Sequence, residues 1–204
     1  MNHETAEHRL IVASTNLGKV QEVRLALNDL KNWIVEPLPA GVPEIEESGT
    51  TFIENASLKA AHYSRFVQGL ALADDSGLCV TALGNRPGVH TARYGATAEA
   101  QNQRVLSELA GIGKPAAADR SAAFHCAFVV ARAGSVIWST EARLEGRITE
   151  MPAGDAGFGF DPIFLMPELR KTLAQLTAEE KNRISARGKA LVELKRFLIS
   201  QQNV

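Results

Sequence analysis

Two adjacent acidic residues, Asp74 and Asp75, follow an apolar segment in the run Ala73-Asp74-Asp75-Ser76-Gly77. Charged groups beside a core segment are costly unless they are paired or bound to a metal ion. Carboxylate oxygens are the usual ligands of Mg²⁺, which keeps several waters and bridges to phosphates. One aspartate could therefore ligate a metal ion while it orients or deprotonates a water molecule. A turn with capping aspartates is the alternative.

A second group of acids precedes a predicted helix. The loop of residues 39–50 contains Glu44, Glu46 and Glu47, and either Glu46 or Glu47 could bind a hard cation. Asn55 and Lys59 follow in the helix, four residues apart, so they share one helix face. Both can donate hydrogen bonds to phosphate oxygens. The alternative is a solvated helix face.

The segment Ser14-Thr15-Asn16-Leu17-Gly18-Lys19 leaves a predicted strand and opens a predicted helix. The start of a helix offers unpaired N–H donors and partial positive charge, which favour an anion. Lys19 is unfavourable in the first turn of a bare helix but reasonable if a phosphate lies there. The segment lacks the GxxxxGK[ST] pattern of a Walker loop, and a polar turn with a solvated lysine is the alternative.

A glycine-rich loop spans residues 154–162, and its backbone could approach a ligand closely. Phe158 or Phe160 could stack on a base, and Asp161 could accept a hydrogen bond from a ring N–H. The alternative is a wide turn whose aromatic rings pack in the core.

Three cations, Lys181, Arg187 and Lys189, gather near a predicted break in the last helix. The planar guanidinium of Arg187 suits bidentate recognition of a pair of acceptors. A solvated basic face would explain the same pattern. The five histidines of the chain form no metal-ligand spacing.

The elements that position these groups alternate between strands and helices, an order typical of an α/β protein. Strands are predicted at residues 9–14, 33–38, 70–73, 120–132 and 135–147, the last two joined by a hairpin turn at Ala133-Gly134. Helices are predicted at residues 19–28, from residue 51 to about 69, at 97–110, and from 177 to about 200 with a break near 185–188. Capping-box spacing at Thr51/Glu54 and Thr177/Glu180 explains Glu54 without catalysis.

Composition limits the classes of function. The chain has 204 residues, of which 45% are hydrophobic, and we expect one domain over residues 1–204 without a separable linker. Its net charge of −1 provides no global attraction to nucleic acid, so none is expected as a partner. Cys79 and Cys126 lie in apolar runs and are predicted to be buried free thiols. No signal peptide or membrane span is apparent, so a cytoplasmic location is expected.

Taken together, the motifs resemble the inosine/xanthosine triphosphate pyrophosphatases, a family that acts on non-canonical purine nucleoside triphosphates. The matching segments are STNLGK, ESGTTFIENASLKA, ADDSGL, RPGVHTARYG, FHCAF, GFGFDPIF and KNRISARGKAL. The resemblance implies an α/β fold with an elongated, mixed, twisted sheet, flanking helices, and two lobes around a central cleft. It also implies a homodimer that uses Mg²⁺ to hydrolyse ITP, dITP and XTP to monophosphate and pyrophosphate, which cleanses the nucleotide pool.

The resemblance assigns roles residue by residue. The triphosphate site would be formed by Ser14, Thr15, Asn16, Leu17, Gly18, Lys19, Asn55 and Lys59. Glu46 and Asp75 would be the metal ligands, with Asp75 also the proton acceptor. The remaining substrate contacts would be Ser76, Phe158, Gly159, Phe160, Asp161, Lys181, Ala186 and Arg187. The sequence departs from the family pattern at Ala186, where histidine is usual, and at Phe160, where tyrosine is common.

Three other functions compete with this interpretation. A related house-cleaning pyrophosphatase for modified pyrimidine nucleotides fits the STNLGK turn, although GFGFDPIF fits the purine family better. A nucleotide-binding regulator without turnover would be expected to lack a metal ligand or base, yet Glu46 and Asp75 are present. A structural interaction module leaves the clustered glycines, acids and lysines unexplained.

Overall fold

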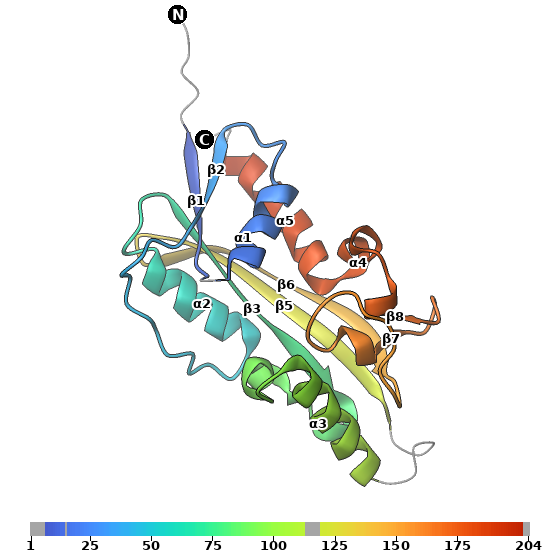
Figure 1. The fold of residues 1–204 in the computed structure, drawn as a ribbon. Coiled ribbons are helices and arrows are strands. Elements are labelled where there is room, and N and C mark those ends of the chain that lie inside the picture. The colour runs from blue at the N-terminus through green and yellow to red at the C-terminus, as the bar shows by residue number, and fades with distance from the viewer. Residues whose placement is uncertain (1–6, 15, 113–118, 202–204) are drawn as a thin grey trace, which may run out of the picture. The chain divides into compact units, whose positions relative to one another are not determined.

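The computed structural model describes residues 7–14, 16–112 and 119–201. Within them the strands form one eight-stranded sheet in the order β2-β1-β3-β5-β6-β7-β8, with β4 paired to β3 (Figure 1). β1 pairs in parallel with β2 and β3, whereas β7 is antiparallel to β6 and β8. The strands are β1 His8–Val12, β2 Trp33–Pro37, β3 Leu70–Val80, β4 Arg86–Pro87, β5 Ser121–Arg132, β6 Ser135–Ile148, β7 Phe164–Met166 and β8 Lys171–Thr172. The predicted α/β class with a mixed sheet is confirmed.

Five α-helices accompany the sheet in the described part of the chain: α1 Leu17–Ala26, α2 Phe52–Tyr63, α3 Ala98–Gly111, α4 Ala178–Ile184 and α5 Ala186–Gln201. Short 3₁₀ turns span Thr81–Leu83, Gly88–Arg93, Asp161–Ile163 and Leu173–Gln175. Both predicted capping boxes are present, at the starts of α2 and α4. The predicted break near residues 185–188 is also confirmed, because Ser185 separates α4 from α5. The second helix was predicted too long, since α2 ends at Tyr63.

The predicted end of strand β3 is wrong. We expected the strand to end at Ala73, but it continues through Asp74 and Asp75 to Val80. The two carboxylates are tolerated in a strand beside the core because lysine side chains pair with them. The alternative of a turn with capping aspartates is therefore wrong.

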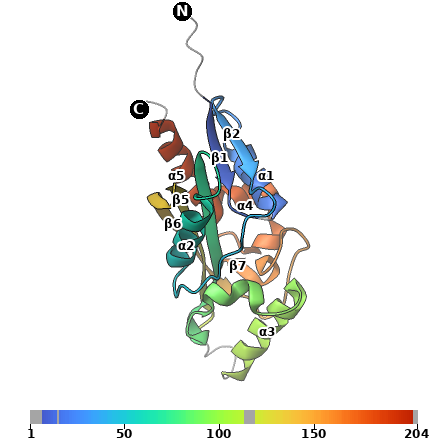
Figure 2. The same ribbon diagram turned by 90° about the vertical axis from the view of Figure 1, so that its left-hand side faces the viewer.

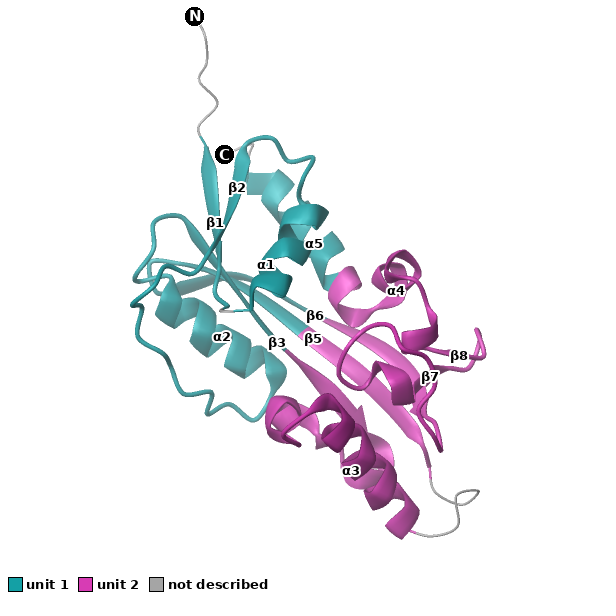
Figure 3. Cartoon of the chain, viewed as in Figure 1, with its two compact units in different colours: residues 1–75, 127–141, 190–204 teal, residues 76–126, 142–189 magenta. Residues whose placement is uncertain are grey.

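The chain divides into two compact units (Figure 3). Unit 1 comprises residues 1–75, 127–141 and 190–204, and unit 2 comprises residues 76–126 and 142–189. In unit 1, α1 lies against β1 and β2 (Figures 1 and 2), over a core that includes Leu10, Val20 and Leu72. The core of unit 2 includes Leu109 from α3 and Phe164 from β7.

Neither cysteine forms a disulfide, as predicted, and Cys126 is buried, but the prediction of burial is wrong for Cys79, which is partly exposed. Among the helices that the structure describes, none combines the length and the apolar character that crossing a membrane would require. The Ala/Pro-rich composition of residues 113–119 predicts a surface connection, but apart from Asp119 this segment lies outside the described residues.

Candidate functional site

In unit 1, strand β3 presents Asp74 and Asp75, each of which receives a different lysine. Consecutive residues of a strand point to opposite faces of the sheet. The Asp74 carboxylate, 6% exposed, accepts from Lys19 of α1, with 2.8 Å between Oδ2 and Nζ. Asp75 Oδ1 lies 3.7 Å from Nζ of Lys59, which comes from α2. The two acids predicted from their adjacency therefore meet the two lysines predicted from other motifs.

Asn55 and Lys59 share one face of helix α2, as their four-residue spacing predicts, and that face meets Asp75. Asn55 is 2% exposed, and its Nδ2 donates to Asp75 Oδ2 over 3.2 Å. Its Oδ1 accepts from the backbone N–H of Gly49 over 2.8 Å. Because one buried amide bonds both to β3 and to the acidic loop, that loop is held beside Asp75.

The acidic loop contributes Glu47 to this cluster. Glu47 Oε2 lies 3.1 Å from Nζ of Lys59, so Glu47 and Asp75 share one ammonium group. Glu46, the ligand implied by the family pattern, is exposed. The described residues contain no group of three or more His, Cys, Asp or Glu side chains able to hold a metal ion. Two carboxylates around one cation are nevertheless enough for Mg²⁺, because this ion usually keeps waters and substrate oxygens as its other ligands.

The environment of Asp75 makes its carboxylate more basic. Burial raises the pKa of the Asp75 carboxyl, the Lys59 ammonium and the Asn55 hydrogen bond oppose that shift, and the nearby Glu47 and Asp74 charges add to it. The net pKa lies above the ordinary value of an aspartate. A raised pKa suits a carboxylate that accepts a proton from water near neutral pH.

The start of α1 differs from the anion site that the sequence suggested. Asn16 is the N-cap, and its Oδ1 accepts from Gly18 N at 2.9 Å and from Lys19 N at 3.4 Å. Ser14 Oγ accepts from Asn16 N at 3.1 Å. The asparagine thus satisfies two of the helix N–H groups that were expected to be unpaired. Leu17 is exposed, and Thr15 lies outside the described residues.

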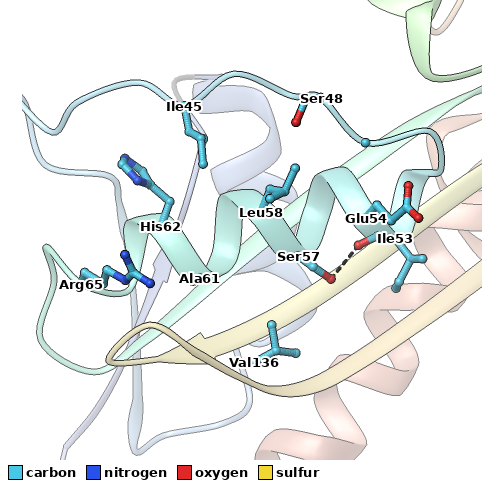
Figure 4. A pocket seen from close by; sticks show the side chains of 11 residues that line it. Ile45, Ser48, Ile53, Glu54, Ser57, Leu58, Ala61, His62, Arg65 and Val136 are labelled. Carbon is cyan, nitrogen blue, oxygen red and sulfur yellow. Dashed lines mark hydrogen bonds between the residues drawn. The ribbon is translucent and has the colours of Figure 1, made fainter.

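A cavity of about 630 Å³ lies on another side of α2 (Figure 4). Its lining combines apolar side chains, among them Ile53 and Leu58 of the helix and Val136 of β6, with the polar side chains of Glu54 and Arg65. None of the predicted site residues lines it. At 100° per residue, Ile53 and Ala61 are turned away from the face that carries Asn55 and Lys59. The charged cluster, where the predicted acids and lysines meet, is therefore the candidate for the phosphate site.

In unit 2, the glycine-rich loop and α4 bring together Phe158, Asp161 and Lys181. Asp161 is 2% exposed, and its Oδ2 accepts from Phe158 N at 2.8 Å and from Lys181 Nζ. The Lys181 ammonium also lies 4.1 Å from the centre of the Phe158 ring. Two motifs that were separate in the sequence thus form one cluster, in which a buried carboxylate neutralises the lysine.

The two aromatic candidates of this loop have different environments. Phe160 is 2% exposed and belongs to the core, whereas Phe158 is 67% exposed. Phe158 is therefore the ring available to stack on a base. Gly157 allows the tight turn because its φ is +78°, and a Cβ there would lie 2.1 Å from Asp161 Oδ2.

The remaining predicted contacts also belong to unit 2. Ser76 is partly buried in β3. Ala186, the first residue of α5, is buried with 3% exposure, and Arg187 is partly buried. Ser185 Oγ accepts from Gly188 N at 3.0 Å and caps this helix. Ala186, which stands where the family pattern has histidine, is therefore a small residue buried in the core.

Asn102 in α3 was not selected from the sequence. It is 6% exposed, and its Nδ2 donates to the carbonyl oxygen of Gly159 over 3.1 Å. The available signal was a polar residue on the apolar stripe that Val105 and Leu109 continue at helical spacing.

The sequence profile of the Ham1 family matches residues 10–197 of the chain. The chain belongs to the Ham1 family. A Ham1 relative from Treponema denticola, named dITP/XTP pyrophosphatase, is 44% identical over 197 residues, with 93% of this chain and 98% of the relative covered. A protein of the same name from Bacillus subtilis is 43% identical over 193 residues, with 92% and 96% covered. The resemblance inferred from the motifs is thus confirmed.

A solved structure supports the same assignment. The structure of a HAM1 protein from Coxiella burnetii superposes with a TM-score of 0.88 at 39% sequence identity, and the match covers 95% of this chain and 99% of that one. The Ham1 fold therefore extends over nearly the whole chain.

Proposed function

We propose that this Ham1 protein hydrolyses non-canonical purine nucleoside triphosphates, namely ITP, dITP and XTP, to the monophosphate and pyrophosphate. The observation that carries the proposal is the cluster in unit 1, where Asp75 meets Lys59, Asn55 and Glu47. The names of the Ham1 relatives from T. denticola and B. subtilis support the substrate class. The proposed role is removal of damaged purine nucleotides from the cytoplasmic pool.

The residues of unit 1 have the chemistry for the triphosphate. Lys19 and Lys59 carry positive charge that would offset the phosphates and the leaving pyrophosphate, and phosphoryl transfer depends mainly on such positioning and electrostatics. Asp74 and Asp75 keep these ammonium groups in defined positions before substrate binds. Asp75, with its raised pKa, would accept a proton from the attacking water.

Magnesium is the proposed cofactor, and the carboxylates present suit it. Asp75 would be one ligand, and the acidic loop would supply the other: Glu46 by the family pattern, or Glu47 by its contact with Lys59. When bound, Mg²⁺ would polarise the phosphate and lower the pKa of nearby water. The position of the Lys59 ammonium between two carboxylates supports a cation at this place.

The residues of unit 2 have the chemistry for the base. Phe158 offers an exposed ring for stacking. Arg187 can donate to the 6-oxo group of hypoxanthine or xanthine but would meet the amine of adenine unfavourably. An unpaired buried polar group costs about 1–3 kcal/mol, so this contact would reject ATP by about ten- to a hundredfold.

Pyrophosphate release tests the proposal directly. The purified protein is assayed with ITP, dITP, XTP, GTP, ATP and dUTP, in Mg²⁺ and in EDTA. We expect fast release from the first three substrates, slow release from the others, and none in EDTA. Preference for dUTP would instead support the pyrimidine alternative, and binding of ITP without release would support a regulator.

A homodimer is the proposed assembly. Large apolar side chains remain exposed around the cavity on α2, among them Leu58 at 37% and Val136 at 46%. Exposed apolar patches of this kind mark interaction sites, and we propose that a second copy of the chain covers this one.

Val136→Asp should therefore shift the protein from dimer to monomer in light scattering coupled to size-exclusion chromatography. Leu25→Asp is the control, because Leu25 of α1 is 62% exposed and does not line the cavity. A Val136→Asp protein that stays dimeric would exclude this face as the interface.

A further inference from the structure

Helix α3 carries a polar residue where its pattern calls for an apolar one. The buried residues of α3 are Asn102, Val105 and Leu109, whose spacing places them on one inward face. Val105 and Leu109 are fully buried, and Asn102 is 6% exposed. A buried amide has to find hydrogen-bond partners to offset its loss of water, so its contacts indicate why the chain has asparagine here.

Only half of the Asn102 amide is satisfied. Its Nδ2 donates to the carbonyl oxygen of Gly159 over 3.1 Å, while its Oδ1 has no hydrogen-bond partner among the described residues. A buried acceptor without a donor lowers stability. An apolar side chain of similar size would avoid that cost, so the single bond to Gly159 is what asparagine adds at this position.

The Asn102–Gly159 bond holds the loop next to the exposed ring of Phe158. Gly159 lies directly after Phe158, with a positive φ of +60°. Space around it is open, since a Cβ built on Gly159 would meet no atom within 4 Å. Gly159 has no side chain that could pack, and the Asn102 amide holds its peptide directly through the carbonyl oxygen.

The neighbouring bonds of the loop are internal to it, lead to α4, or lead to the 3₁₀ turn Leu173–Gln175, where Ala174 O accepts from Ala156 N over 3.1 Å. Asp161 N donates to Phe158 O over 3.2 Å, and Asp161 Oδ2 accepts from Phe158 N and from Lys181. Asn102 adds an attachment from α3, at the residue that directly follows Phe158. The ring thus lies between two anchored peptide groups, of which Asn102 supplies one.

We propose that Asn102 is a positioning residue that fixes the Gly159 peptide, and through it the orientation of Phe158, so that the enzyme distinguishes among purine bases. This inference rests on the proposed function. Asn102 itself does not touch the nucleotide. Its effect should appear in the choice of base and not in the phosphate chemistry.

The test compares kcat/KM for ITP, GTP and ATP in the wild type, Asn102→Leu and Asn102→Asp. Leucine removes the donor and fills the core, while aspartate keeps the size but cannot donate when ionised. We expect the ratios of ITP to GTP and of ITP to ATP to fall in both Asn102 variants, because the lost bond lies within the protein and reaches these ratios only through the orientation of Phe158. KM for ITP should rise more than kcat falls, because the ring contacts the base.

The ratio of kcat/KM for ITP to that for GTP or ATP does not depend on the fraction of enzyme that is folded. A variant that is only less stable therefore has the same ratios as the wild type. Val105→Ala is the matched control: Val105 lies one turn along the same buried stripe, and its truncation should lower Tm while leaving the ratios unchanged. Unchanged ratios in both Asn102 variants would overturn the inference. Failure of the wild type to release pyrophosphate from ITP would overturn the proposed function instead.

Discussion

Replacing Asp75 with asparagine is expected to remove most pyrophosphate release from ITP while the fold stays intact. Asparagine keeps the shape of the side chain but cannot accept the proton of the attacking water and is a poor ligand for Mg²⁺. Loss of a general base alone slows a reaction by about 10²- to 10⁴-fold. Steady-state kinetics at saturating Mg²⁺ should therefore show a fall in kcat of at least about a hundredfold.

The thermal stability of the Asp75→Asn protein is expected to stay equal or to rise, although its turnover falls. Because the pKa of Asp75 is raised in the folded protein, the folded state holds this proton to a higher pH than the unfolded chain does. The stability associated with the proton is complete below the ordinary pKa of aspartate and is lost as pH rises through the raised value. Asparagine never ionises, so thermal unfolding in EDTA at neutral pH should give an equal or higher Tm.

An appropriate control is Asp29→Asn, which removes the same charge from an exposed carboxylate that pairs with Lys195. Exposed ion pairs contribute only about 0–1 kcal/mol, so this variant should keep wild-type turnover. Near-normal turnover in Asp75→Asn would remove Asp75 from its proposed role. A large fall in Tm would instead mean that the loss of turnover reflects unfolding.

Asp161→Asn is expected to cause the largest loss of stability in unit 2. Asp161 is almost fully buried and neutralises Lys181, whose side chain is only 16% exposed. Removing one partner of a buried pair leaves the other charge uncompensated, which costs about 3–5 kcal/mol. Urea unfolding should show a decrease of this size in the free energy of unfolding, together with weaker discrimination between ITP and ATP because the Phe158 loop is released.

Glu179→Gln supplies the matched control for this experiment. Glu179 lies on α4, like Lys181, and pairs with Arg183 over 2.6 Å, but both side chains are more than 70% exposed. The control should lose no more than about 1 kcal/mol. The double variant Asp161→Asn/Lys181→Met should recover part of the stability, since no unpaired charge remains, without recovering the choice of base. Equal effects of Asp161→Asn and Glu179→Gln would contradict the role of burial.

The sequence predicted most of the fold because local patterns determine it. Helix α2 begins where the Thr51/Glu54 capping box places it, and β5 and β6 are joined at Ala133-Gly134, where both residues have positive φ. The spacing of Asn55 and Lys59 likewise predicted a shared face, and both side chains reach Asp75. Such features depend on residues close in sequence, so one chain is enough to find them.

The errors came from contacts between distant segments. Strand β3 was ended too early because a sequence shows two charges but not the lysines, contributed by α1 and α2, that pair with them. The start of α1 was expected to have free N–H groups, whereas Asn16 occupies two of them. Asn102 escaped notice because its partner, Gly159, lies 57 residues further along the chain.

Helix α2 has a consequence for how Ham1 sequences can vary in length. One face holds Asn55 and Lys59 against Asp75, the next packs Ala56 and Ala60 into the core, and a third borders the cavity. Inserting or deleting one residue in the middle of the helix would rotate everything beyond it by about 100°, which would exchange one face for its neighbour. Natural variation and engineering should therefore proceed here by substitution, with length changes confined to the loops at either end.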